Sequence, residues 1–180
     1  GAHAIYGDAL ETNDTPAQAT NLGTLASGAI NVGDVPAPAV ANGSIVSLHS
    51  GADNDWYRVH VDAAGRLGAT LAPVGLVYED AQQACSGSTA SCCSGTFTDS
   101  ASQLDLAFQV VASNGVTVLS TSNSQGMGQS ETLAGLLVGA GDFFVRVYAA
   151  GGTGETQLYH LTLTKSPCPA DLDDGGGLGV

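Results

Sequence analysis

Apolar side chains recur at every second position in several stretches of this 180-residue chain. The alternation is clearest in residues 56–61, 104–110, 143–148 and 159–163. Shorter stretches with the same period are residues 44–48, 67–71, 116–119 and 132–138. A period of two places alternate side chains on opposite faces of a β-strand, whereas a helix needs a period of 3.6. The pattern therefore predicts a protein built from strands that each bury one face.

Turn-forming residues separate the predicted strands. Strong turn signals are Asn114-Gly115, residues 139–141 and Gly151-Gly152, and the chain has 25 glycines in all. About eight short strands joined in this way are typical of an all-β, jelly-roll-like antiparallel β-sandwich. Residues 15–20 are the only predicted helix, with Pro16 suited to its first position. Residues 21–43 are predicted to be a connecting segment, and residues 79–103 a long polar loop.

The charge of the chain is strongly one-sided. There are 17 acidic residues against 4 basic ones, which gives a formal net charge of −13. This balance argues against nucleic-acid partners and anionic membrane surfaces, because both attract lysine and arginine. No apolar run approaches the ~20 residues of a membrane helix, so no membrane insertion is expected. Divalent cations are natural partners, although the acidity would also serve solubility alone.

Two short acidic clusters concentrate oxygen ligands. The first contains Glu11, Asn13 and Asp14, and the second is Asp53-Asn54-Asp55, directly before an aromatic pair. Calcium takes six to eight oxygen ligands from carboxylates, amides and backbone carbonyls. Neither cluster alone holds enough ligands, so a calcium site requires the fold to bring them together. In the alternative interpretation, Asp14 only caps a helix and residues 53–55 form a solvated turn.

Further motifs follow these clusters in a specific order. Gly43-Ser44-Ile45 precedes Asp53-Asn54-Asp55-Trp56-Tyr57, and residues 104–106, 116–119, 141–148 and 159–163 come later. Together with the pattern at Glu11, Asn13, Asp14 and Ala19, this series resembles the bacterial pre-peptidase C-terminal domain over about residues 8 to 164. That family is a jelly-roll-like β-sandwich and includes the collagen-binding domains of bacterial collagenases.

The resemblance implies a calcium site at one edge of the sandwich. Carried over residue by residue, with a backbone oxygen near Gly43 or Ser44, it assigns as ligands Glu11, Asn13, Asp14, Asp53 and Asp55. Collagen binders of this type have a second glutamate two residues before the first, where this chain has Ala9. The adjacent Asp8 is the candidate substitute. One calcium ion rather than two is therefore expected.

The cysteines predict disulfides rather than a metal centre. The four are Cys85, Cys92, Cys93 and Cys168, and their spacing matches no zinc site. An even number in an acidic, lysine-poor chain favours disulfides, with free thiols as the alternative. A Cys92–Cys93 bond would be strained. Each of the two remaining pairings closes the 85–93 loop and ties the other cysteine to Cys168.

The tail after Cys168 resembles the start of a dockerin calcium loop. Asp171 and Asp173 match positions one and three of such a loop. Gly175 stands at position five and offers no side chain. No complete second calcium site is therefore predicted in the tail.

No catalytic motif is recognisable in the sequence. The histidines form no metal pair, and Gly-x-Ser-x-Gly, His-Glu-x-x-His and phosphate-loop patterns are missing from the sequence. We therefore expect a non-catalytic protein. The sequence starts at Gly1 without a signal peptide, which is typical of a mature or trimmed product, and we expect the protein to be secreted or attached to the cell surface.

Two roles fit these expectations. The first is a structural subunit of a self-assembling fibre, a homo-oligomer in which segments 1–10 and 165–180 join neighbouring copies of the domain 11–164. The second is an accessory module of a larger secreted protein that binds an extracellular protein or glycan. The exposed aromatic candidates for such binding are Trp56, Phe144 and Tyr148, too few to favour collagen itself.

Overall fold

The computed structural model describes residues 8, 10–26, 28–33, 46–80, 96–152 and 156–167. Its strands are β1 (Thr20–Leu25), β2 (Gly28–Val32), β3 (Ser47–Leu48), β4 (Asn54–Val61), β5 (Gly65–Val74), β6 (Val77–Asp80), β7 (Thr96–Asp99), β8 (Leu104–Ala112), β9 (Val118–Ser122), β10 (Glu131–Val138), β11 (Gly141–Gly152) and β12 (Gln157–Pro167). The predicted all-β class is confirmed. The described residues include no helix of the length and apolarity that a membrane span requires.

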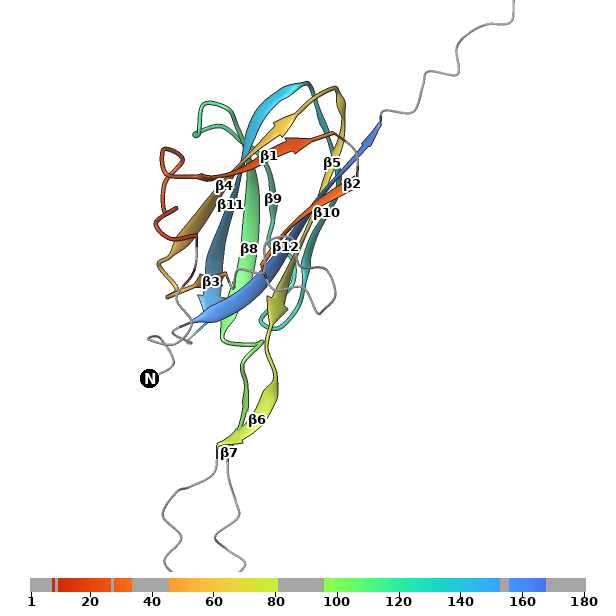
Figure 1. Cartoon of the computed structure of the whole chain (residues 1–180). Helices are drawn as coiled ribbons and strands as arrows, with labels where there is room; N and C mark the ends of the chain where they lie inside the picture. Colours follow the sequence, from red (N-terminus) through yellow and green to blue (C-terminus); the bar gives the residue numbers. More distant parts are fainter. Residues whose placement is uncertain are drawn as a thin grey trace, which may run out of the picture.

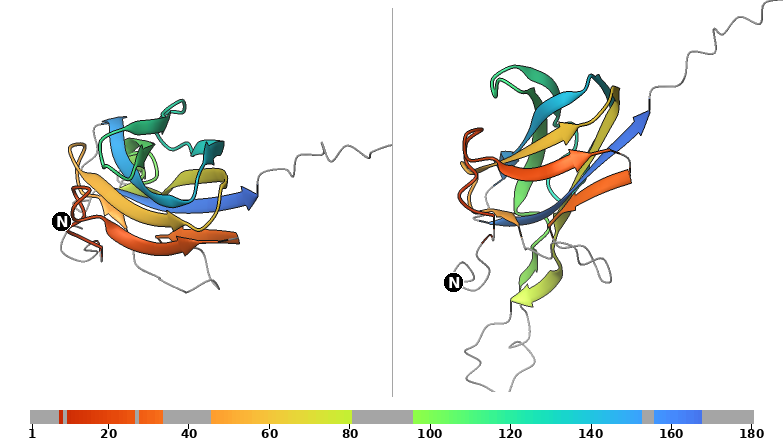
Figure 2. Two further views of the ribbon diagram at one scale, coloured as in Figure 1. Left: turned by 90° about the horizontal axis from the view of Figure 1, so that it is seen from above. Right: turned by 45° about the horizontal axis from the view of Figure 1, so that its top comes forward.

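Two sheets pack against each other to form the sandwich (Figure 1, Figure 2). Sheet A has the strand order β1-β4-β11-β8-β9, and sheet B has the order β10-β5-β12-β2, with β3 also paired to β12. A separate ribbon of β6 and β7 extends from one end of the sandwich (Figure 1). Among the described strands, β1 and β4 are parallel and the other pairs are antiparallel.

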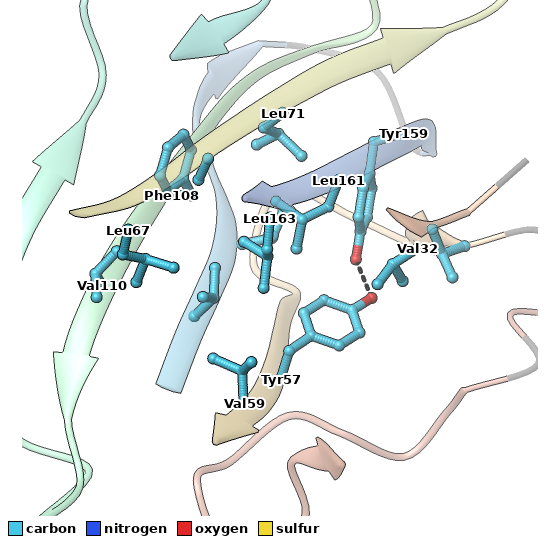
Figure 3. Packing of buried hydrophobic residues seen from close by; sticks show 14 of the residues in the cluster. Val32, Tyr57, Val59, Leu67, Leu71, Phe108, Val110, Tyr159, Leu161 and Leu163 are labelled. Atoms are coloured by element: carbon cyan, nitrogen blue, oxygen red, sulfur yellow. Dashed lines mark hydrogen bonds between the residues drawn. The ribbon is translucent and has the colours of Figure 1, made fainter. Parts of the chain in front are cut away.

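The core lies between the sheets, where the predicted alternation places it. In β4, Tyr57, Val59 and Val61 are fully buried, whereas Arg58 and His60 are exposed. Leucines and valines of β5, β8, β11 and β12 fill the space around them (Figure 3). Truncating such a leucine to alanine costs about 2–5 kcal/mol, so this core dominates stability. Two tyrosines meet within it, because the hydroxyl oxygens of Tyr57 and Tyr159 are 2.5 Å apart (Figure 3).

Residues 15–20 do not form the predicted helix. The Gln18 N–H donates to the Thr15 carbonyl at 2.9 Å in a single turn, and Thr20 already begins β1. The predicted connecting segment contains β1 and β2, so the predicted count of about eight strands was too low. Gly23, with φ of +82°, permits the register shift of β1 against β4. Pairing with β4 outweighs the weak local helix signal.

The predicted long loop at residues 79–103 also contains strand. The end of β6 and all of β7 fall within it. All four cysteines, Cys85, Cys92, Cys93 and Cys168, lie outside the described residues, and so does the dockerin-like tail. The predicted disulfides therefore stay predictions. Strand β12 continues to Pro167, past the predicted domain boundary at residue 164.

Candidate metal site

Residues 8 and 10–14, called the N-terminal segment below, are attached to the sandwich beside the start of β4. The Trp56 N–H donates to the Asn13 carbonyl at 2.8 Å. The Asp8 carboxylate accepts the N–H of Ser47 and the N–H of Leu10, each at 2.8 Å. The segment is thereby held against both β4 and β3, and its acidic residues come close to those that precede and open β4.

The two acidic clusters of the sequence meet at this end of the molecule. Carboxylate oxygens of Asp8, Glu11 and Asp55 lie within 4.8 Å of one another. Glu11 also belongs to a second group of the same spacing, with His49 and Asp53. Glu11 is therefore common to both groups of possible ligand atoms.

Asp55 is fully buried, and its carboxylate is only partly hydrogen-bonded. It is 0% exposed, its Oδ2 accepts the Tyr159 hydroxyl at 2.5 Å, and its Oδ1 has no hydrogen-bond partner. Burial raises the pKa of Asp55 to about 8, with a further rise from Asp8 and a partial offset by the Tyr159 hydrogen bond. Ionising a carboxyl in such a place is costly unless a cation lies beside it.

Asn13 is another buried polar residue whose side chain lacks ordinary hydrogen bonds. It is 0% exposed, and neither Oδ1 nor Nδ2 makes a hydrogen bond of ordinary geometry. Its amide lies beside the Tyr57 hydroxyl: burial raises the pKa of Tyr57 well above its usual value, and Asn13 opposes that rise. A buried amide left unpaired costs about 1–3 kcal/mol. A bound cation would satisfy the free oxygens of both residues, Asn13 Oδ1 and Asp55 Oδ1, but not the Asn13 Nδ2.

His49 and Asp53 form the more open side of the cluster. Glu11 Oε1 lies 2.6 Å from His49 Nδ1, and Asp53 Oδ2 lies 3.4 Å from the same nitrogen. The Asp53 carboxylate also accepts the N–H of His49 at 2.6 Å and that of Asn54 at 2.8 Å, which closes the turn before β4. Burial raises the pKa of Glu11, and the negative charge of Asp53 raises it further.

The remaining predicted ligands lie differently. Asp14 is exposed and belongs to neither group, although it lines the same shallow cavity as Glu11, His49 and Asp53. Ser44 lies outside the described residues. The sequence did not single out His49, and its position four residues before Asp53 was the available signal. Asp8, the candidate substitute for the missing glutamate, lies within the first group.

The donor atoms suit a hard cation. Carboxylates of Asp8, Glu11, Asp53 and Asp55 and the Asn13 amide supply oxygen, which calcium prefers. The carboxylates fall into two groups that share Glu11, and in each group the ligand atoms are close enough together to hold a metal ion. Within the described residues, the fold and this cluster define an all-β sandwich with a group of carboxylates gathered at one end.

No family model matches the chain, and no curated protein sequence does. Among solved structures it is similar to the pre-peptidase C-terminal domain of collagenase from Bacillus anthracis, at 12% identity and a TM-score of 0.45, over 81% of this chain and 94% of that chain. It is also similar to PliG, a periplasmic inhibitor of g-type lysozyme from Aeromonas hydrophila, at 13% identity and a TM-score of 0.39, over 82% and 100% of the two chains.

A third similar structure is the carbohydrate-binding module CBM36 in complex with calcium and xylotriose. Identity is 14% and the TM-score is 0.36, over 78% of this chain and 89% of that chain. At these scores the likeness extends to neither a ligand nor an activity.

Proposed function

We propose that the chain is a non-catalytic, calcium-binding β-sandwich that works outside the cell, secreted or at the cell surface. The observation that carries the proposal is the buried Asp55 carboxylate, whose Oδ1 is unpartnered within a group of three carboxylates. The Asn13 Oδ1, also without a hydrogen bond of ordinary geometry, adds a second buried oxygen. The proposed ligands are Asp8, Glu11, Asn13, Asp53 and Asp55, with Asp14 at the rim. The motif order that resembles the pre-peptidase C-terminal domain supports the same ion.

The proposed ion would control the path of the N-terminal segment. Its ligands come from that segment and from the residues around the start of β4, so binding would join the two. The turn that follows lies against the β8–β9 turn, where a Cβ on Gly115 would be only 2.9 Å from Pro16 Cβ. A side chain at position 115 would crowd Pro16, and the φ of +68° independently favours glycine there.

The outer face of sheet A favours the role of an accessory binding module. The Arg146 guanidinium carbon lies 4.8 Å from the Tyr148 ring centroid and 5.9 Å from that of Trp56. Its Nε and Nη2 donate to Asn54 Oδ1 at 2.9 and 2.6 Å, so a neutral amide rather than a carboxylate holds it. The expected third aromatic, Phe144, is only 9% exposed. A half-buried cation near two aromatic rings offers a surface on which an extracellular protein or glycan can bind.

A subunit of a self-assembling fibre is the second candidate. Among the described strands, β1 and β9 end sheet A, and β10 and β2 end the main path of sheet B. Such edges can accept a strand from a neighbouring copy. The segments that would supply it lie mostly outside the described residues. Light scattering in calcium would show growing particles for a fibre subunit and only monomers for a separate module.

Calcium titration calorimetry tests the proposal directly. The metal-free wild-type chain should bind one calcium ion, and Asp55→Asn should lose that binding. The matched control is Asp142→Asn, because Asp142 is an acidic residue 46% exposed in its side chain and paired with His60 away from the cluster. It should bind like wild type. Absence of binding to the wild-type chain would contradict the proposal.

A further inference from the structure

The ribbon of β6 and β7, called the arm below, leaves the sandwich at one end (Figure 1, Figure 2). It pairs Val77 with Asp99, Tyr78 with Thr98 and Glu79 with Phe97. Residues directly opposite in an antiparallel pair share a face. Val77 and Phe97 therefore lie on one face of the arm, together with Glu79 and Asp99, and Tyr78 lies on the other.

The arm exposes an unusual amount of apolar side chain for its length. Phe97 is 71% exposed, Val77 65% and Tyr78 51%, and Leu76 at the base is 79% exposed. Each arm strand has a single partner strand among those described, so each has an open edge. A two-stranded ribbon alone is marginally stable in water. Exposed apolar faces beside open edges mark places where another chain adds.

Hydrogen bonds fix the base of the arm. The Ser100 hydroxyl accepts the Leu76 N–H at 2.8 Å and donates to the Leu76 carbonyl at 2.9 Å. Gln157 is 0% exposed, and its amide donates to the Ser100 carbonyl at 3.2 Å and accepts the Gln103 N–H at 2.9 Å. The buried Gln157 side chain thus anchors the base of the arm to the sandwich. The apolar side chains of β6 and β7 beyond that base are exposed to solvent.

We propose that the arm docks an extended, apolar and basic segment of a partner protein, added as a strand along its edge with apolar side chains against Val77 and Phe97. Charge decides between occupants. Glu79 and Asp99 share the docking face, where the Asp99 carboxylate also accepts the Ala101 N–H and the Ser102 hydroxyl. The whole chain carries a net charge of −13, so a second copy is repelled and a lysine-rich or arginine-rich strand is attracted. Backbone pairing would supply affinity, and alternate side chains specificity. This inference is independent of the calcium site.

The test uses the full chain and two labelled probes, short peptides of alternating Val and Lys and of alternating Val and Glu. Fluorescence anisotropy should show that the Val–Lys peptide binds the wild-type chain and that the Val–Glu peptide does not. Val77→Ser with Phe97→Ser should weaken binding about tenfold or more. Leu137→Ser, at a residue 63% exposed on β10, is the matched control and should bind like wild type. Thermal melts check that each variant is folded.

Three outcomes would overturn the inference. One is no binding of the Val–Lys peptide to the wild-type chain. Another is equal binding to the folded Val77→Ser, Phe97→Ser variant, which would place the peptide elsewhere on the acidic surface. The last is self-association of the wild-type chain that the same pair of substitutions abolishes, which would make a second copy the occupant.

Discussion

Two carboxylates, Asp55 and Glu131, are equally buried, each at 0% exposure, yet their surroundings are opposite. Glu131 Oε2 accepts the Ser122 hydroxyl at 2.8 Å, and Oε1 accepts the N–H groups of Ser124 at 2.8 Å and Gln125 at 2.5 Å. Asp55 accepts one hydroxyl, has one bare oxygen, and lies among other carboxylates.

The difference separates a structural carboxylate from a candidate ligand. Neutral donors satisfy both oxygens of Glu131, which thereby closes the connection between β9 and β10 without any ion. Asp55 has only one donor and lies near other negative charges, so the protein alone does not compensate its carboxylate. Burial alone does not distinguish Asp55 from Glu131, because their properties depend on the hydrogen-bond donors and charges around each carboxylate.

Replacing Glu131 should have the largest effect on stability. Glu131→Ala leaves the Ser124 and Gln125 N–H groups without their acceptor, so the free energy of unfolding should fall by about 3 kcal/mol or more. Urea unfolding should show the same loss with and without calcium. If calcium restored the stability of this variant, Glu131 would belong to the ion site and the contrast would fail.

Replacing Asp55 should act through calcium. In Asp55→Asn the calcium stabilisation should vanish, which at a hundredfold excess over the dissociation constant is ~2.7 kcal/mol. The calcium-free variant should be more stable than the calcium-free wild type at neutral pH, because a neutral amide replaces a carboxyl that resists ionisation. Urea unfolding in both conditions measures both effects. An undiminished response to calcium in this variant would remove Asp55 from the site.

The calcium-free protein should become less stable as pH rises. The pKa of Asp55 rises from 3.8 to about 8 on folding, so between these values the native state keeps a proton that the unfolded state has lost. The free energy of unfolding should therefore fall by up to about 1.4 kcal/mol per pH unit in that window. Asp55→Asn should flatten the slope. A wild-type slope of the opposite sign would show that other groups outweigh Asp55.

The smallest expected effect concerns the orientation of Asp55. Tyr159→Phe removes the hydroxyl that holds Asp55 Oδ2, and loss of such a supporting partner weakens metal affinity about tenfold. Tyr78→Phe, at a residue 51% exposed on the arm, is the matched control and should bind calcium like wild type. Calcium titration of the two variants compares them, and equal affinities would mean that Tyr159 does not position the ligand.

Much of the fold could be predicted because burial follows the alternation of the sequence. Tyr57, Val59 and Val61 are buried as their period of two requires. β1 and β2 could not be predicted, because their apolar residues are few and pairing with β4 and β12 makes them strands. The arm escaped notice for the same reason, since its strands are short and bury little.

The candidate site could be predicted only in part. The clusters containing Glu11 and Asp55 are visible as acidic runs, and the structure brings them together. His49 lies on a turn whose shape depends on the hydrogen bonds of Asp53, which the sequence does not reveal. Glu131 gave no signal either, because its partners come from the loop that it closes.

The most direct test of the calcium site is thermal melting of the wild-type chain in saturating calcium and in excess chelator. At a hundredfold excess over the dissociation constant, calcium should raise the melting temperature by about 5–10 °C for a domain of this size. Asp55→Asn should melt at the same temperature in both conditions. Identical melting temperatures for the wild-type chain would contradict the account, because the unpartnered oxygens of Asp55 and Asn13 would then need no ion.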